Sequence, residues 1–345
     1  MKIRYLFFTG IIFLLFCQPK SKLPYLLVID GPTMGTVYSV KIVSSDLSTV
    51  KADSLSLRRG IDSLLHRINQ QMSTYQETSE LSVFNQYRRK DWFTVSYELC
   101  LVVEKSLEIS ELSGGAFDVT VGPLVNLWGF GPEEREELLP GEKEILQRKK
   151  LVGYEKLQVQ FTPPALKKEI PEMYCDLSAI AKGYGVDKVG EYLEKRGIKN
   201  YLVDIGGEIR TRGKNHLGQA WKIGVSTPDD RYEIQKVLVL DNLSVATSGD
   251  YRNYFEKDGI RYSHTIDPQT GRPITHNLAS VTVIHNSCMI ADGLATAIDV
   301  LGPEKGFQLA EKLGLAVFLI IRENTTFIER MTPQFEKIVN SDQNK

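Results

Sequence analysis

The stretch that decides the fold is DLSAIAKGYG, Asp176 to Gly185. Its glycines raise the question of a dinucleotide-binding fold. The glycines here stand at 183, 185 and 190, which is not the G-x-G-x-x-G spacing, and they fall within the expected helix rather than before it. We therefore reject a Rossmann fold. Asp176 or Ser178 is expected to cap this helix, and free amides at its start, together with Lys182, suit either a bound anion or a plain capped amphipathic helix.

Outward from this stretch, strands and helices come in mixed runs. Apolar spacing predicts helices over 54–70 and 97–113, the second ending at Gly114-Gly115. A helix over 287–301 is expected to stop at Gly302, and Pro303 then begins the next one. Strict alternation of strand and helix is missing, which favours an α+β fold over a doubly wound sheet. Short strands are predicted at 37–43, 156–161, 201–204, 221–225, 237–240, 261–265, 278–284 and 315–321.

Composition excludes several classes of protein. The 345 residues carry 42 Lys and Arg against 43 Asp and Glu, a net charge of −1, and 42% of them are apolar. This is an ordinary globular composition, so a polytopic membrane protein and a disordered chain are both excluded. No long basic run is present, which argues against nucleic acid as the main partner.

The N-terminus predicts export. Two cationic residues, Lys2 and Arg4, precede the apolar run 5–16, which is too short to span a bilayer and fits a signal peptide. Cys17 follows directly, as in the lipobox of bacterial lipoproteins, although Phe16 departs from the small residue preferred there. We expect a signal over 1–16, acylation of Cys17 and a tether over 17–29; an uncleaved or soluble secreted segment is the alternative.

One pair of residues suggests a metal. Asp292 and Thr296 are four apart in an expected helix, so they share a face and present a carboxylate beside a hydroxyl. Both are hard oxygen donors, which suit Mg²⁺ or Ca²⁺. The alternative is an Asp that stabilises an early helical turn and a Thr that bonds its own backbone.

Three further motifs carry possible chemistry. Gly114-Gly115, before Ala116-Phe117-Asp118, allows backbone to approach a flat ligand, or is simply a helix stop. Tyr75 could stack on an aromatic ring or pack against the core. His264, three residues before Asp267, could be an acid or base, or be structural.

Together and in this order, the motifs resemble the ApbE family of FAD:protein FMN transferases. The matching stretches cover about residues 30–325. They are Met34-Gly35-Thr36, MSTYQETSELSVFN from Met72, GGAFDVTVGPLVNLWGFG from Gly114, DLSAIAKGYGVDKV from Asp176, NYLVDIGGEIRTRG from Asn200, ATSGDYRNYF from Ala246, SHTIDPQTGRP from Ser263 and ADGLATA from Ala291.

The resemblance implies a single α+β unit over 30–330, built of two mixed subdomains with FAD in the cleft between them, and a C-terminal tail over 331–345. It implies Mg²⁺-dependent transfer of FMN from FAD to a Thr or Ser hydroxyl of a partner protein, with release of AMP. The metal ligands would be Asp292, Thr296 and the carbonyl of Ala179, and His264 would be the base. The residues expected to contact FAD are Met34, Tyr75, Ala116, Phe117, Asp118, Asp176, Lys182 and Ile266.

Two other functions remain open: an FAD pyrophosphatase that gives FMN and AMP, and a flavin-binding lipoprotein without turnover. The resemblance implies an acceptor that carries D-x-x-[ST]-G-A-[ST], expected to be a membrane redox subunit. The chain's own Asp267-x-x-Thr270-Gly271 matches only the first half and is read as a turn. We expect a lipid-anchored protein on the periplasmic side of a bacterial membrane, the inner membrane rather than the outer.

Overall fold

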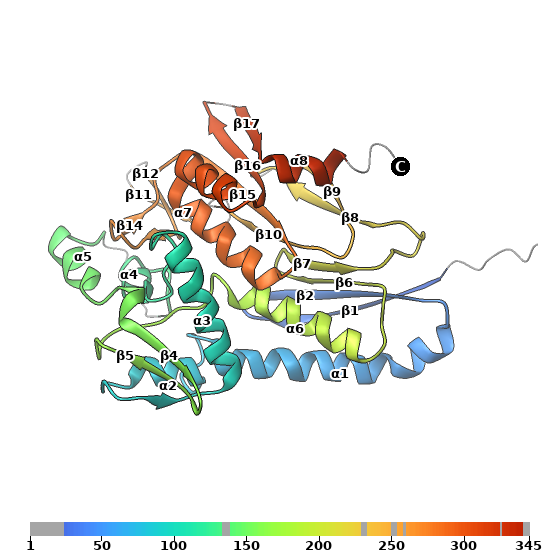
Figure 1. Ribbon diagram of the computed structural model, residues 1–345, viewed down its shortest axis with the longest axis horizontal. Helices are drawn as coiled ribbons and strands as arrows, with labels where there is room; N and C mark the ends of the chain where they lie inside the picture. Colours follow the sequence, from blue (N-terminus) through green and yellow to red (C-terminus); the bar gives the residue numbers. More distant parts are fainter. Residues whose placement is uncertain are drawn as a thin grey trace, which may run out of the picture.

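The computed structural model describes residues 24–132, 139–228, 233–249, 254–257, 260–324 and 326–340. Its centre is an eight-stranded sheet whose neighbouring strands are all antiparallel (Figure 1). In spatial order the strands are β1 (Tyr25–Thr33), β2 (Thr36–Ser44), β6 (Tyr201–Ile205), β7 (Glu208–Arg212), β10 (Ser244–Ser248), β15 (Leu278–His285), β16 (Ala316–Glu323) and β17 (Thr326–Met331).

The two faces of this sheet are covered by different elements. Helices α1 (Leu47–Met72), α6 (Ala181–Lys195) and α7 (Cys288–Lys312) pack on one face, and the hairpin β8 (Trp221–Ser226)–β9 (Ile234–Leu240) with α8 (Pro333–Asn340) packs on the other. Alternation along β16 shows this division. Val317 and Leu319 belong to the α7 core, whereas Phe318 and Ile320 belong to the core under the hairpin and α8.

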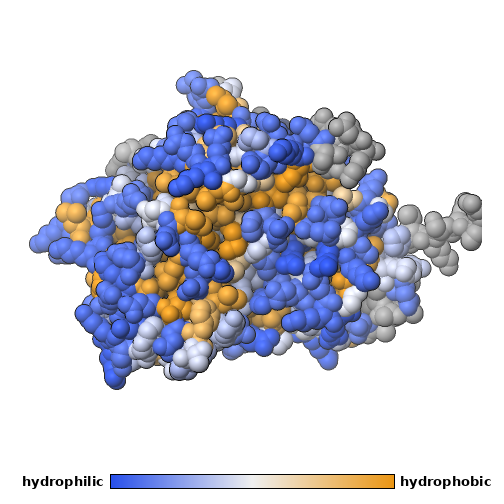
Figure 2. Space-filling model, in the orientation of Figure 1, coloured by the Kyte–Doolittle hydropathy of each residue, from blue (hydrophilic) through white to orange (hydrophobic). Residues whose placement is uncertain are grey.

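A second group of elements lies at one end of the sheet, at the left of Figure 1. It contains a three-stranded sheet, β3 (Phe93–Thr94), β5 (Pro164–Lys168) and β4 (Leu157–Phe161), and the helices α2 (Glu80–Gln86), α3 (Tyr97–Leu112), α4 (Gly122–Leu127), α5 (Glu142–Lys149) and η1 (Tyr154–Lys156). Two short hairpins complete the chain: β11 (Tyr254–Lys257)–β12 (Ile260–Ser263) and β13 (Ile266–Asp267)–β14 (Arg272–Pro273). Apolar residues gather over α3 and α7, where the largest core cluster joins the two groups (Figure 2). The predicted α+β class is confirmed.

Helix boundaries predicted from capping and glycine residues in the sequence are correct at several positions. Helix α3 occupies the predicted range, with the Ser96 hydroxyl accepting from the amide of Leu99 at 3.2 Å. The predicted break at Gly302 is confirmed by its φ of 77°, between two helical segments that run on as α7. The start of α6 was predicted wrongly. It begins at Ala181 with Ile180 at the N-cap, so neither Asp176 nor Ser178 caps it.

The folded unit extends beyond the expected bounds of 30 and 330 at both ends. Strand β1 pairs along its whole length with β2, so residues from Tyr25 onward belong to the sheet rather than to a tether. Pro32 is compatible with β1 because β1 is an edge strand. At the other end, Phe335 of α8 is fully buried and stacks on Phe318, with ring centroids 5.4 Å apart. The predicted signal peptide and Cys17 lie outside the described residues, among which no helix is long and apolar enough to cross a membrane.

Replacing Phe335 tests whether α8 is part of the folded core. Because the ring is fully buried, Phe335→Ala is expected to lower the free energy of unfolding by about 3–5 kcal/mol. Urea unfolding followed by circular dichroism measures this change. Lys337→Ala, at an exposed position of the same helix, is the control and is expected to change stability little. A loss below about 1 kcal/mol for Phe335→Ala would mean that α8 is a loosely attached tail.

Candidate functional site

The site is built on a close contact between the start of α6 and the first half of α7. The amide of Gly183, in the first turn of α6, donates to Asp292 Oδ2 at 2.9 Å. A Cβ on Gly183 would lie 2.4 Å from the carbonyl oxygen of Cys288 and 2.8 Å from Asp292 Cβ. Only glycine permits this approach, which places the Asp292 carboxylate at the positive end of the α6 dipole.

A second carboxylate, that of Asp187 in α6, accepts from the start of α7, just as Asp292 in α7 accepts from the start of α6. Asp187 of α6 accepts from the hydroxyl of Ser287 at 2.7 Å and from the amide of Met289 at 3.1 Å, so it caps α7. Its other oxygen accepts from Arg210 of β7 at 2.9 Å. Each helix therefore supplies a carboxylate that accepts from an amide in the first turn of the other helix, and Asp187 also joins α6 to β7.

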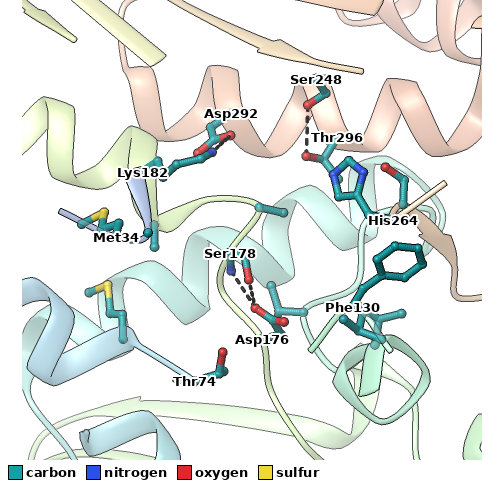
Figure 3. A pocket seen from close by; sticks show the side chains of 18 of the residues that line it. Met34, Thr74, Phe130, Asp176, Ser178, Lys182, Ser248, His264, Asp292 and Thr296 are labelled. Carbon is teal, nitrogen blue, oxygen red and sulfur yellow. Dashed lines mark hydrogen bonds and ion pairs between the residues drawn. The ribbon is translucent and has the colours of Figure 1, made fainter. Parts of the chain in front are cut away.

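A cavity of about 1040 Å³ opens beside this contact (Figure 3). Its walls come from the β1–β2 turn, the C-terminal end of α1, the loop after α3, the segment before α6, and α7. All the residues expected from the sequence to bind FAD, hold the metal or act as the base line it: Met34, Tyr75, Ala116, Phe117, Asp118, Asp176, Ala179, Lys182, His264, Ile266, Asp292 and Thr296. Segments far apart in the chain thus meet in one cavity.

Two of the three oxygen donors expected for a metal, Asp292 and Thr296, lie on adjacent turns of α7, and the third, the carbonyl of Ala179, lies in the segment before α6. Asp292 is only 3% exposed. Its Oδ2 accepts from the Gly183 amide, and its Oδ1 lies 3.7 Å from the Lys182 ammonium. The hydroxyl of Thr296 lies 3.3 Å from that of Ser248, which brings a further hard oxygen to the same place. Among the described residues no three His, Cys, Asp or Glu side chains form a metal cluster. This donor set fits Mg²⁺, which uses few protein ligands and takes the rest from phosphate and water.

A buried ion pair adjoins Asp292. The Lys182 ammonium lies 3.0 Å from Glu208 Oε1 and 3.7 Å from Asp292 Oδ1. Burial alone would lower the pKa of Lys182, but the two carboxylates outweigh it and hold that pKa above its ordinary value. Burial raises the pKa of Glu208, and the neighbouring ammonium opposes this rise. Lys182 therefore remains a cation in the cavity.

The charge of the cavity wall is negative. The lining contains four carboxylates, those of Asp118, Asp176, Glu208 and Asp292, and one ammonium, that of Lys182, which gives a formal charge of −3 when all are ionised. A ligand with a pyrophosphate would meet net repulsion here. A cation beside such a ligand would offset this repulsion, which suits the oxygen donors on α7.

Two of the acids predicted to contact FAD, Asp118 and Asp176, accept hydrogen bonds from backbone amides of the chain. Asp118 Oδ1 accepts from the amide and the hydroxyl of Thr120 at 2.8 and 2.7 Å, and Oδ2 accepts from the amide of Tyr154 at 3.0 Å. Burial raises the pKa of Asp118, while these hydrogen bonds lower it. Asp176 bonds the amide of Ser178 at 2.8 Å in a turn ahead of α6. Both acids therefore shape the cavity wall.

His264 stands on the opposite side of the cavity from Lys182 (Figure 3). The residue after it, Thr265, makes two hydrogen bonds. The Thr265 amide donates to Ser263 Oγ at 3.1 Å, and the Thr265 hydroxyl donates to the buried Asp299 of α7 at 3.2 Å. Phe130 lies edge-on to the imidazole, with ring centroids 6.4 Å apart. At the rim, Tyr75 is 68% exposed. The residue next to His264 is thus held to α7, the helix that carries Asp292 and Thr296.

Comparison with known proteins identifies the class. The model of the ApbE family matches residues 34–319. The chain is 47% identical to the FAD:protein FMN transferase of Vibrio cholerae, covering 90% of this chain and 92% of that one, and 42% identical to that of Haemophilus influenzae, covering 94% of each. Among solved structures, the flavin transferase ApbE from Vibrio cholerae matches with a TM-score of 0.83 at 44% identity, over 91% of this chain and 99% of the other. The apo flavinyl transferase ApbE of Pseudomonas stutzeri matches with a TM-score of 0.83 at 40% identity, over 92% and 97%.

The fold and cavity define an α+β protein with a large ligand site between its two groups of elements. The chain belongs to the ApbE family. The polar residues of the cavity that were not predicted as site residues include Glu208 and Ser248. Glu208 follows Gly206-Gly207 at the first position of a strand, and an acid directly after a glycine turn was the available signal. Ser248 lies within the matching stretch ATSGDYRNYF, but no role was predicted for it.

Proposed function

We propose that this protein transfers FMN from FAD to a Thr or Ser hydroxyl of an acceptor protein, forming a phosphoester and releasing AMP. The observation that supports this most is the convergence of Asp292, Thr296, Lys182 and His264 on one large cavity. Membership of the ApbE family, with identities of 40–47% to FAD:protein FMN transferases, supports the same class of reaction.

The proposed reaction balances without an added reactant. The acceptor oxygen bonds to the phosphorus of the FMN half, and the bond from that phosphorus to the bridging oxygen breaks. AMP leaves with the bridging oxygen. The hydroxyl proton passes to an imidazole nitrogen of His264, and the Lys182 ammonium donates to a phosphate oxygen. Such transfers depend mainly on positioning and charge neutralisation.

The metal in this proposal is Mg²⁺, held by Asp292, Thr296 and the carbonyl of Ala179. When bound, it would supply positive charge beside the pyrophosphate and favour the departure of AMP. The formal charge of −3 on the cavity wall supports this requirement. The chain's own residues bind and orient the ends of the substrate.

We further propose that the protein is exported, acylated at Cys17 and anchored on the periplasmic side of a membrane, the inner membrane rather than the outer. The support is the apolar run 5–16 followed by Cys17 in the sequence. An acceptor bearing D-x-x-[ST]-G-A-[ST] in a membrane redox subunit would be reachable from that position.

The reaction is tested with purified protein, FAD and Mg²⁺, with and without a carrier that bears D-x-x-T-G-A-T. We expect the carrier to gain the mass of one FMN, with AMP appearing only in that arm. Intact-mass spectrometry and AMP chromatography measure both products. Free FMN and AMP in both arms with an unmodified carrier would identify an FAD pyrophosphatase. Bound, unchanged FAD in both arms would identify a flavin carrier, and FMN on Thr270 would mean that the chain modifies itself.

Asp292→Asn tests the metal site. Asparagine keeps an oxygen that can accept from Gly183 but removes the charge, so the fold should survive. We expect turnover to fall at least 100-fold at low Mg²⁺, with partial recovery as Mg²⁺ increases. Initial rates against Mg²⁺ concentration measure this. Asp241→Asn, an exposed acid outside the cavity, is the control. Full activity of Asp292→Asn at low Mg²⁺ would contradict the assignment.

His264→Ala tests the proposed base. We expect kcat to fall by about 10²–10⁴-fold because proton removal loses its acceptor, while FAD affinity stays unchanged. Flavin fluorescence on titration gives the affinity, and carrier modification gives the rate. His66→Ala, on the exposed side of α1, is the matched control. If affinity falls in step with rate, His264 binds FAD instead.

A further inference from the structure

Glu208 is a buried carboxylate whose presence in the cavity is not explained by the proposed reaction. It is 4% exposed and lines the cavity at the first position of β7. Its Oε1 contacts the Lys182 ammonium at 3.0 Å. Its Oε2 is buried and makes no hydrogen bond with any described residue. A carboxylate left half unsatisfied in the interior is destabilising, so its retention calls for a reason in the site itself.

The placement of Glu208 is fixed by the turn that precedes it. Gly206 and Gly207 both have positive φ, of 65° and 107°, and they join β6 to β7 in a tight turn. The Gly206 amide donates to the carbonyl of Val37 at 3.1 Å, and the Gly207 amide donates to Asp204 at 2.9 Å. Glu208 is thus anchored in the central sheet, whereas Lys182 and Asp292 come from the two helices above it.

The Lys182 ammonium lies between two acids. It is closer to Glu208, at 3.0 Å, than to Asp292 Oδ1, at 3.7 Å. The other Asp292 oxygen is occupied by the Gly183 amide. A cation that binds Asp292 from the cavity and the ammonium of Lys182 would therefore compete for the same carboxylate. The long, flexible lysine stem can carry its charge to either acid.

We propose that Glu208 is a positioning residue that holds the Lys182 ammonium off Asp292 and so leaves this carboxylate available to the divalent cation. This inference rests on the proposed function, in which that cation binds at Asp292. Without the charge of Glu208, the remaining acid beside the ammonium is Asp292, so Lys182 closes on it and weakens cation binding.

A double-mutant cycle separates this role from direct attraction of the cation by Glu208. The probe is Mn²⁺ alone, titrated into the purified protein without FAD, and the loss of the free Mn²⁺ electron paramagnetic resonance signal measures binding. The proteins are the wild type, Glu208→Gln, Lys182→Met and the double variant. We expect Glu208→Gln to weaken Mn²⁺ binding about tenfold and the double variant to bind as Lys182→Met does.

Glu194→Gln is the matched control, because Glu194 also pairs with a partly buried cation, Arg210 at 3.0 Å, but lies outside the cavity. It should leave Mn²⁺ affinity unchanged. Should Glu208→Gln fail to fold, Glu208→Asp replaces it: the charge remains, but the shorter side chain draws away from Lys182, and the same weakening is expected.

Three results would overturn the proposal. Unchanged Mn²⁺ affinity in Glu208→Gln means that Lys182 does not compete for Asp292. Equal weakening with and without Lys182 means that Glu208 attracts the cation itself. If the wild type binds no Mn²⁺ that Mg²⁺ can displace, the cation site of the proposed function fails as well, which distinguishes that failure from one of Glu208 alone.

Discussion

The structure depends on the hydrogen bond between the Gly183 amide and Asp292. It requires α6 and α7 to approach so closely that a single methyl group on Gly183 would overlap the α7 backbone. The reciprocal bonds of Asp187 to the start of α7 fix the second end of the same contact. Helix caps of this kind contribute about 0.5–2 kcal/mol each, but their larger effect here is geometric. They set where Lys182, Ala179 and Asp292 lie relative to one another.

Two acids in an otherwise apolar stretch of α7 connect this helix to the two sides of the cavity. Between Cys288 and Leu301 the only charged residues are Asp292 and Asp299, and both are buried. Asp292 joins α6 to the cavity, and Asp299 holds the hydroxyl of Thr265 beside His264. The two sides of the cavity are therefore positioned by one helix, about two turns apart. Movement of α7 would displace the proposed cation site and the proposed base together.

The sequence predicted those parts of the fold that depend on local signals. Ser96 at the start of α3 and Gly302 in α7 act through their own backbone, so their effects are readable from neighbouring residues. The start of α6 was not readable, because its cap comes from Asp292, more than a hundred residues away. The family resemblance of the motifs predicted a set of site residues, and the structure places all of them in the lining of one cavity. Glu208 escaped because its role depends on a tertiary contact with Lys182.

The charges of the site favour separate partners for the two cations: Glu208 for the Lys182 ammonium and Asp292 for the proposed divalent cation. A cavity wall whose formal charge is −3, with the Lys182 ammonium already included, repels a pyrophosphate. If Lys182 were free to neutralise Asp292, the site would satisfy itself and have little need of a cation. Glu208 prevents this by engaging the ammonium from the sheet side. Oδ1 of Asp292 then stays available where the proposed reaction requires a divalent cation. The buried acid Glu208, which costs stability, is in this proposal a condition for cation binding.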